Sequence, residues 1–195
     1  MQQEEYLEQL HAIFTTISEL SSDTWEDVKA AWVVPKKLQR NDFLLSPGQV
    51  GQHLYYVKKG AMKYYYLHEG EEICIGFAYP GTVAVAYPSF IKKLPTKYYM
   101  QAINACELVG ITRQDFYDIV EKHPSMERCW RMLAEEALLG KIERELEMLT
   151  FTPEERFKRL FERSPHLFQL IPQKYIASYL RMKPETLSRI KKRVW

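Results

Sequence analysis

The sequence lacks any run of apolar residues long enough to cross a membrane. A membrane-spanning helix needs about 18 or more consecutive apolar residues, and no stretch of the chain approaches that length. The first ten residues, MQQEEYLEQL, are acidic, whereas a secretion signal begins with basic residues followed by apolar ones. We therefore expect a cytoplasmic protein with no membrane partner.

Residues for metal or covalent chemistry are also scarce. The three cysteines, Cys74, Cys106 and Cys129, are far apart and form no C-x-x-C pair. We expect them to be reduced thiols in the core, because free cysteine is usually buried, and an iron–sulfur centre would need a cysteine cluster. The histidines are scattered singly, and no phosphate loop, carboxylate pair or nucleophile–base motif is evident. The sequence thus predicts no metal, no cofactor and no enzyme.

Positive charge is concentrated at one end of the chain. Residues 171–195 contain seven Lys or Arg and one Asp or Glu, a net charge of +6, whereas residues 1–170 contain 20 and 24, a net charge of −4. A localised basic surface on an otherwise acidic molecule is typical of proteins that bind a polyanion.

The basic end also has a regular apolar pattern. Two sets of apolar residues recur at helical spacing: Ile176, Ala177 and Leu180, then Leu187, Ile190 and Val194. Pro184 lies between the sets and suits the first turn of a helix, where its missing N–H has no partner to lose. The pattern predicts two short amphipathic helices separated by residues 181–183.

The middle of the chain favours β-structure. We expect a helix from about Gln3 to Ser18 and a second from about Ser22. From about Val33 to Ile111, short β-prone runs are separated by glycines at positions 48, 60, 70 and 81. Such regular turn signals indicate an antiparallel barrel or sandwich, with a hairpin turn at Glu69 and Gly70.

One long helix is predicted over residues 125–149, after a shorter helix that ends at Pro124. Its length would be about 37 Å at 1.5 Å per residue. Five apolar residues have the spacing of a heptad seam: Met132, Leu139, Ile142, Leu146 and Leu149. We interpret this seam as a homodimer interface; the alternative is that every apolar side chain packs within its own subunit. After the helix, Thr152, Pro153 and Glu155 have the pattern of a capping box.

This order of elements resembles the catabolite activator and Fnr (Crp/Fnr) family of bacterial transcription regulators. The segment FLLSPGQVGQHLYYVKKGAMKYYYLHEGEEICIGFAYPG is similar to the family's cyclic-nucleotide-binding barrel, and IPQKYIASYLRMKPETLSRIKKRV to its helix-turn-helix. The resemblance implies an α+β protein with an N-terminal double-stranded β-helix or jelly-roll barrel over residues 1–124, a dimerisation helix over 125–149 and a helix-turn-helix domain over 150–195. It also implies a homodimer that senses a small-molecule effector and binds double-stranded DNA, with RNA polymerase as a further candidate partner.

The second basic helix can read base edges in the major groove of DNA. An arginine presents a forked donor to guanine and a carboxylate accepts from cytosine, roles that we assign to Arg189 and Glu185. Contacts to the DNA backbone fix the register and are expected from Gln173, Lys174, Thr186, Ser188 and Lys192.

The basic region departs from the family pattern at three points. Lys183 and Pro184 replace a polar cap and a base-reading arginine, so one guanine contact should be absent. Arg181 replaces a glycine that is common in the turn. Because the sequence stops at Trp195, just after the second helix, we expect the domain to lack a wing.

The barrel departs further from relatives that bind cyclic nucleotides. Those relatives offer a glutamate to the ribose and an Arg–Ser pair to the phosphate, whereas this chain has Ala86, Thr96 and Lys97 at the matching positions. Each charge-assisted hydrogen bond lost is worth about 1.5–3 kcal/mol, and a lysine would replace an arginine fork only in part. We expect no cyclic AMP binding. The barrel then either binds an unrelated effector in an apolar, tyrosine-lined pocket or serves only as a scaffold. The expected pocket residues are Ala86, Tyr87, Thr96, Lys97 and Tyr98.

Two functions therefore remain open. The first is a sequence-specific, homodimeric transcription regulator. The second is a ligand-binding or protein-interaction module whose helix-turn-helix no longer binds DNA.

Overall fold

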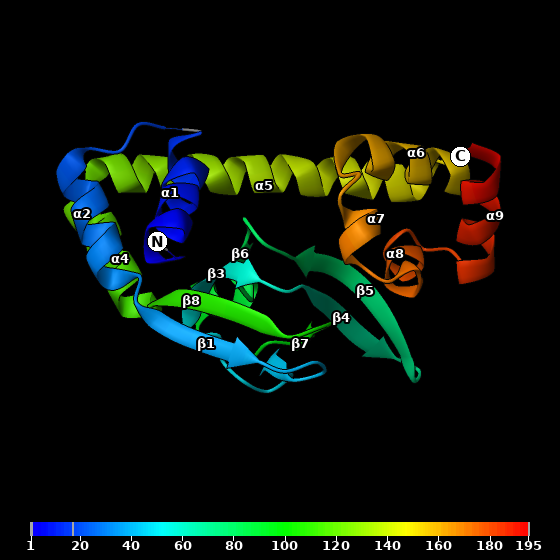
Figure 1. The fold of residues 1–195 in the computed structure, drawn as a ribbon, viewed down its shortest axis with the longest axis horizontal. Coiled ribbons are helices and arrows are strands. Elements are labelled where there is room, and N and C mark those ends of the chain that lie inside the picture. Colours follow the sequence, from blue (N-terminus) through cyan, green and yellow to red (C-terminus); the bar gives the residue numbers. More distant parts are fainter. Residues whose placement is uncertain (1, 17, 195) are drawn as a thin grey trace.

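Two antiparallel four-stranded sheets form the centre of the computed structural model, which describes residues 2–16 and 18–194 (Figure 1). One sheet has the order β1-β8-β3-β6 and the other β2-β7-β4-β5. The strands are β1 (Val34–Leu38), β2 (Phe43–Leu45), β3 (His53–Lys59), β4 (Met62–His68), β5 (Glu71–Ala78), β6 (Val83–Ala84), β7 (Tyr99–Ala102) and β8 (Cys106–Thr112). This alternation of strands between two sheets is that of a jelly roll. The predicted antiparallel barrel or sandwich is confirmed.

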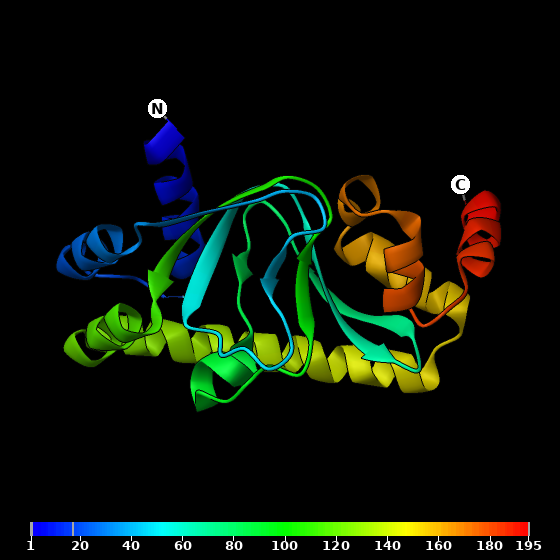
Figure 2. The same cartoon turned by 90° about the horizontal axis from the view of Figure 1, so that it is seen from below.

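The hairpin of β4 and β5 turns where the sequence predicted. Glu69 and Gly70 form a two-residue turn with φ angles of 51° and 82°. Two consecutive positive φ values fit a type I′ turn, whose twist matches that of the flanking strands. The hairpin extends from the sandwich beneath the C-terminal helices (Figure 2), so β5 forms an edge of its sheet on that side.

The N-terminal helices cover one end of the sandwich. Helices α1 (Gln2–Thr15), α2 (Ser22–Ala31) and α4 (Arg113–Lys122) pack with the start of α5 around a common core. Trp32 is fully buried in this core, and its indole N–H donates to the carbonyl of Val109 over 2.8 Å. Helix α1 ends at Thr15, earlier than predicted, and Ile17 lies outside the described residues.

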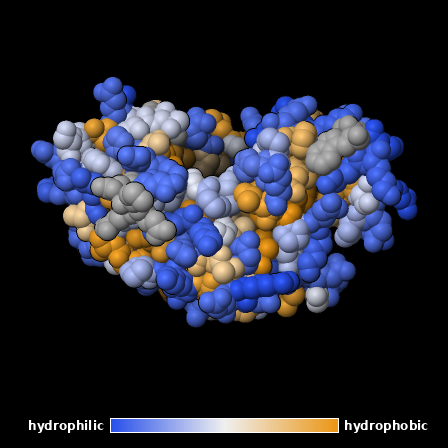
Figure 3. Space-filling model, in the orientation of Figure 1, coloured by the Kyte–Doolittle hydropathy of each residue, from blue (hydrophilic) through white to orange (hydrophobic). Residues whose placement is uncertain are grey.

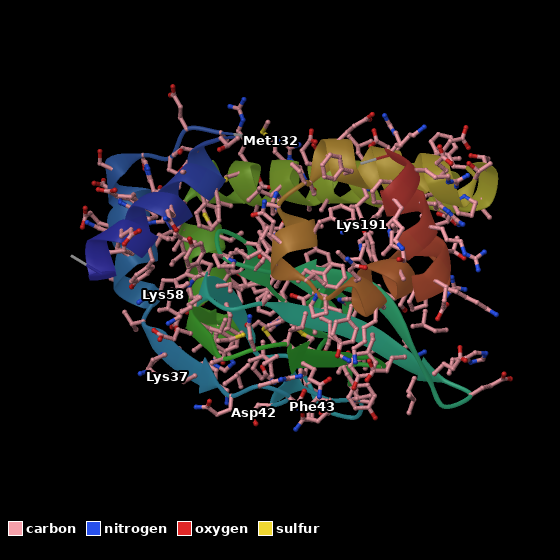
Figure 4. The ribbon with its side chains drawn as sticks, turned by 45° about the vertical axis from the view of Figure 1, so that its right-hand side comes forward. Lys37, Asp42, Phe43, Lys58, Met132 and Lys191 are labelled. Atoms are coloured by element: carbon pink, nitrogen blue, oxygen red, sulfur yellow. The ribbon has the colours of Figure 1, made fainter. Side chains whose placement is uncertain are left out.

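Helix α5 (Pro124–Thr150) runs along most of the molecule, from the N-terminal helices to the C-terminal ones (Figure 1). Its predicted bounds agree with the structure to within one residue. The exposed large apolar residues of this helix are Leu138, Leu139, Ile142, Leu146 and Leu149. Met132, the remaining residue of the predicted seam, is half-buried and projects away from the sheets (Figure 4). The alternative that every apolar residue of α5 packs in its own subunit is therefore wrong.

Four helices follow α5 and share a separate core. They are α6 (Pro153–Arg163), α7 (Leu167–Leu170), α8 (Gln173–Tyr179) and α9 (Pro184–Val194). Their core contains Phe157, Leu160, Ile176, Leu187 and Ile190, all buried. The side chain of Val194 and all of Trp195 lie outside the described residues, so the predictions for them stay predictions. No helix within the described ranges is long and apolar enough to cross a membrane.

The capping box at the start of α6 is confirmed. The Thr152 hydroxyl accepts from the Glu155 backbone N–H over 3.3 Å, and the Glu155 carboxylate accepts from the Thr152 N–H over 2.8 Å. The hydrogen bond from the Thr152 backbone is the main cause of a lowered pKa for the Glu155 carboxyl. These bonds satisfy backbone donors that a helix start otherwise leaves unpaired.

We predict that Thr152→Ala lowers the free energy of unfolding by about 1 kcal/mol, the usual cost of losing an N-cap side chain. Thr150→Ala is the matched control, because the Thr150 hydroxyl bonds to the Leu146 carbonyl one turn earlier in α5 and caps no helix start. Urea denaturation of both variants measures the difference. Equal losses in the two variants would contradict a specific role for the cap.

Candidate nucleic-acid interface and effector pocket

Helices α8 and α9 are joined by a tight turn at residues 181–183. The Arg181 N–H donates to the Ser178 carbonyl and the Met182 N–H to the Ala177 carbonyl, both over 3.0 Å. Arg181 has a φ of +57°, in the left-handed region that glycine occupies most easily. The position at which the family commonly has glycine thus requires a left-handed backbone, and here an arginine adopts it.

Helix α9 has one buried and one exposed side. Leu187 and Ile190 are buried in the C-terminal core, whereas Glu185, Arg189 and Lys192 are exposed. Ser188 is half-buried and lies three residues after Glu185 and four before Lys192, so it falls in the same row. The two residues predicted to read bases and two of those predicted to contact phosphates therefore share one face of α9, at the far end of the molecule (Figure 1).

The predicted contact residues of α8 lie at its start. Gln173 and Lys174 are both exposed. The Lys174 ammonium is 4.8 Å from the centroid of the Tyr175 ring, a cation–π distance. The two side chains are available at the surface, and their contact with DNA stays a prediction.

A groove separates the exposed side of α9 from the start of α6. Thr186, Arg189 and Lys192 line it on one side and Thr152 and Pro153 on the other. An ion pair bridges it, with Arg193 Nη2 3.0 Å from Glu154 Oε2. Sequence reasoning missed both charges of this pair. The signal for Arg193 was its place four residues after Arg189, which puts the two on the same side of a helix.

The helix pair is docked on the edge of the sandwich. The Ser178 hydroxyl accepts from the Cys74 N–H and donates to the Glu72 carbonyl, each over 3.0 Å. Both backbone groups belong to β5. Beside them, the Arg144 guanidinium of α5 donates to the Tyr179 carbonyl over 2.9 Å. Helix α8 therefore covers the edge strand β5 and pairs backbone groups of β5 that would otherwise be free.

A buried lysine strengthens this contact. Lys63 of β4 is 3% exposed and forms an ion pair with Glu72. Its ammonium is 4.3 Å from the ring centroids of both Tyr65 and Tyr175. Tyr175 comes from α8, so one cation joins the barrel to the helix pair through two aromatic faces. No feature of the local sequence had indicated this cluster.

The barrel contains a cavity of about 200 Å³. It is lined by Leu44, Leu45, Val50, Gly51, Gln52, His53, Tyr55, Ala84, Val85, Ala86 and Met100. None of these residues is Lys, Arg, Asp or Glu. Burial is the main cause of a lowered pKa for His53, whose ring stacks 5.3 Å from that of Tyr55. The cavity is thus mostly apolar, with polar groups only from neutral side chains and the backbone.

The five residues expected in the effector pocket do not line one cavity. Ala86 lines the barrel cavity, whereas Tyr87 is exposed and lies against Trp130, with 5.9 Å between ring centroids. Thr96 is buried, and its hydroxyl accepts from the Tyr98 N–H over 3.3 Å. Lys97 is exposed.

Tyr98, the last of the five, is buried among other tyrosines. Its ring centroid is 6.4 Å from that of Tyr64 and 5.6 Å from that of Tyr66. Burial raises the pKa of the Tyr98 phenol to about 12, so the group is a neutral hydrogen-bonding group at physiological pH. Binding of an effector by these residues stays a prediction.

The cysteines lie in the core as expected. Cys74, Cys106 and Cys129 are free and buried. Burial raises the pKa of the Cys74 thiol to about 12 and those of Cys106 and Cys129 to about 11. In the part of the chain that the structure describes, no three His, Cys, Asp or Glu residues are grouped so that they could hold a metal ion.

Comparison with known proteins agrees with this architecture. Residues 35–123 match the family model described as "Cyclic nucleotide-binding domain". FixK2 from Bradyrhizobium japonicum is 19% identical with a TM-score of 0.68, over 83% of each chain. The c-di-GMP-responsive global regulator CLP from Xanthomonas campestris is 15% identical with a TM-score of 0.64, over 89% of this chain and 91% of that one. The catabolite activator protein of Thermus thermophilus is 21% identical with a TM-score of 0.54, over 87% of this chain and 82% of that one.

No curated protein sequence matches the chain. Residues 35–123 match the cyclic nucleotide-binding domain, and the chain shares the fold of Crp/Fnr-family transcription regulators. The resemblance to that family noted in the sequence is confirmed.

Proposed function

We propose that the protein is a homodimeric transcription regulator that recognises a DNA sequence with α9. The observation that carries this proposal is the row of exposed Glu185, Arg189 and Lys192 with half-buried Ser188, on a helix whose other side is buried in its own domain. The fold shared with Crp/Fnr regulators supports it.

The chemistry of the row fits a major groove. Arg189 can donate two hydrogen bonds to guanine, and Glu185, one turn earlier, can accept one from cytosine. Ser188, Lys192 and Thr186 flank these two residues and can bind phosphates. Gln173 and Lys174, at the start of α8, are exposed and extend the expected contact to the backbone.

The dimer is supported by the exposed apolar side of α5. Leu139, Ile142 and Leu146 recur every three or four residues and are largely exposed in the single subunit, which is the pattern of a two-stranded coiled coil. A two-fold dimer would present two α9 helices to DNA, and such pairs read half-sites about 34 Å apart.

Salt dependence of DNA binding tests the proposal. We expect affinity for a duplex of random sequence to fall steeply between about 50 and 200 mM salt, with a log–log slope of about −0.9 for each phosphate neutralised. The competing proposal, an interaction module that does not bind DNA, predicts no measurable binding or a flat response. A flat response would therefore exclude the DNA-binding function.

We predict that cyclic AMP does not bind the barrel. None of the described residues that line the barrel cavity is Lys or Arg, and the Lys97 side chain is exposed. A ligand that binds the native state raises stability by RT ln(1 + [L]/Kd), so about 100 μM cyclic AMP should leave the melting temperature unchanged. A rise of several degrees that Lys97→Ala abolishes would show that this lysine rebuilds a phosphate site, contrary to the prediction.

A further inference from the structure

A second cavity lies outside the barrel, between α1, the start of α5 and the β6 side of the sandwich. Its volume is about 220 Å³. Its walls are Ile13, Phe14, Trp32, Leu54, Gly81, Thr82, Val83, Val85, Tyr87, Trp130, Leu133, Ala134 and Ala137. Val85 borders both this cavity and the one in the barrel. Figure 3 shows the surface hollowed beside α1, over the middle of α5, with hydrophobic residues at the edges of the hollow.

The walls carry no charged side chain, and two of their polar groups are already bonded within the protein. The Thr82 hydroxyl accepts from the Tyr79 N–H over 3.0 Å and donates to the Tyr79 carbonyl over 2.8 Å. The Trp32 indole N–H donates to the Val109 carbonyl. Water needs two to four polar partners to be held at a site, and these walls, which open to the surface, offer few. A space of this kind therefore favours an apolar molecule over water.

Aromatic rings make up much of the wall. Phe14 and Trp32 are in edge contact, with 6.0 Å between centroids, and Tyr87 and Trp130 lie 5.9 Å apart. Rings that line a site gain most from offset or edge contacts with another ring. The wall therefore favours a flat aromatic ligand over a branched aliphatic one of equal volume.

A partner subunit is not the natural occupant of this space. Helical positions are about 100° apart, so Leu133 and Ala137 of the cavity wall lie on the opposite side of α5 from Ile142 and Leu146 of the exposed stripe. Ala134, also of the wall, is only about 40° around the helix from exposed Leu138, so the cavity borders the stripe at this one edge. A ligand in the cavity and a partner on the stripe would therefore contact mainly different sides of one helix.

We propose that this cavity is a binding site for an uncharged aromatic small molecule of one or two fused rings. The ligand contacts α1, the sandwich and α5 at once. This proposal rests on the volume of the cavity and the chemistry of its walls. It does not depend on DNA binding by α9.

Calorimetric titration of the full chain with naphthalene tests the site. We expect saturable binding of one molecule per chain with a negative heat-capacity change, the mark of apolar burial. Ala134→Phe places a ring in the cavity and should weaken binding at least tenfold. Ala12→Phe, on the exposed side of α1, is the matched control and should bind as the wild type does. Absence of binding to the wild type, or equal binding to Ala134→Phe and wild type, overturns the proposal.

A second measurement uses a different readout. 4-Bromotoluene, whose heavy atom quenches nearby tryptophans, should reduce the fluorescence of the wild type with a saturable dose response. Trp32 and Trp130 both line the cavity, so Ala134→Phe, which fills it, should lose this quenching, whereas Ala12→Phe should keep it. Quenching that is unchanged in Ala134→Phe, or naphthalene binding that is lost in Ala86→Leu but retained in Ala134→Phe, would place the ligand elsewhere and exclude this site.

Discussion

Replacing Leu139 and Ile142 by lysine is expected to convert the protein from a dimer into a monomer at micromolar concentration. The two side chains are 54% and 45% exposed in the single subunit. Burying one such side chain contributes about 1.5–3 kcal/mol, and an unpaired charge in its place carries a further desolvation cost. A dimer loses four apolar side chains at once. Because about 1.4 kcal/mol changes an equilibrium tenfold, the dimer dissociation constant should rise by at least about a thousandfold.

Sedimentation equilibrium of the variant and the wild type measures this effect. The matched control is Leu67→Lys with Leu94→Lys, which replaces two leucines that are 55% and 58% exposed and lie outside α5. It adds the same charge and should leave the dimer intact. A wild type that is monomeric at micromolar concentration would end the homodimer proposal. Dissociation of the control as well would mean that added charge, and not the α5 stripe, causes the effect.

The second large effect is expected from Arg189→Ala, which should cost about 1–3 kcal/mol of DNA affinity and relax the preference at one base pair. The reason is the loss of two parallel hydrogen bonds to a guanine edge. Lys192→Ala, which removes a cation from the same face, should weaken binding to all sequences alike and reduce the salt slope by about one unit. Glu185→Ala should alter the preference at a neighbouring pair with little change in the salt slope, because a carboxylate neutralises no phosphate.

A base-by-base affinity profile of the three variants separates these roles. Arg40→Ala is the control, because Arg40 is an exposed cation in the loop between β1 and β2, far from α9 in the sequence. Its removal should change neither the profile nor the slope appreciably. If the three α9 variants weaken every duplex equally, the helix is an electrostatic anchor, and sequence-specific reading by α9 is wrong even though DNA binding remains.

The predictions that agree best with the structure concern features formed by residues close together in the sequence. The capping box of Thr152 and Glu155 closes within one helical turn, and the turn at Glu69 and Gly70 needs only two residues with positive φ. The row on α9 was also predictable, because side chains three or four residues apart share one side of any helix. The exposed seam of α5 followed from the same periodicity.

The effector pocket was not predictable in this way. Ala86 and Tyr87 are adjacent in the sequence, but they line different cavities because the chain passes from β6 into α3 (Tyr87–Lys92) at this point. The Thr96 hydroxyl accepts a local hydrogen bond from the Tyr98 N–H. The Tyr98 ring is buried against that of Tyr66. Of the five pocket residues that the resemblance predicted, Ala86 alone lines the barrel cavity.

The sequence by itself determined the backbone pattern: a two-sheet sandwich, one long helix and a basic helix pair broken before Pro184. These features depend on periodicity, turn residues and caps, all of which act over a few neighbouring positions. Only the tertiary structure decided how the parts meet. Ser178 bonds to Glu72 across 106 positions of the chain, and Lys63 lies between Tyr65 of the barrel and Tyr175 of α8. Such contacts stabilise the fold only after distant segments have packed together, so no local pattern in the sequence specifies them.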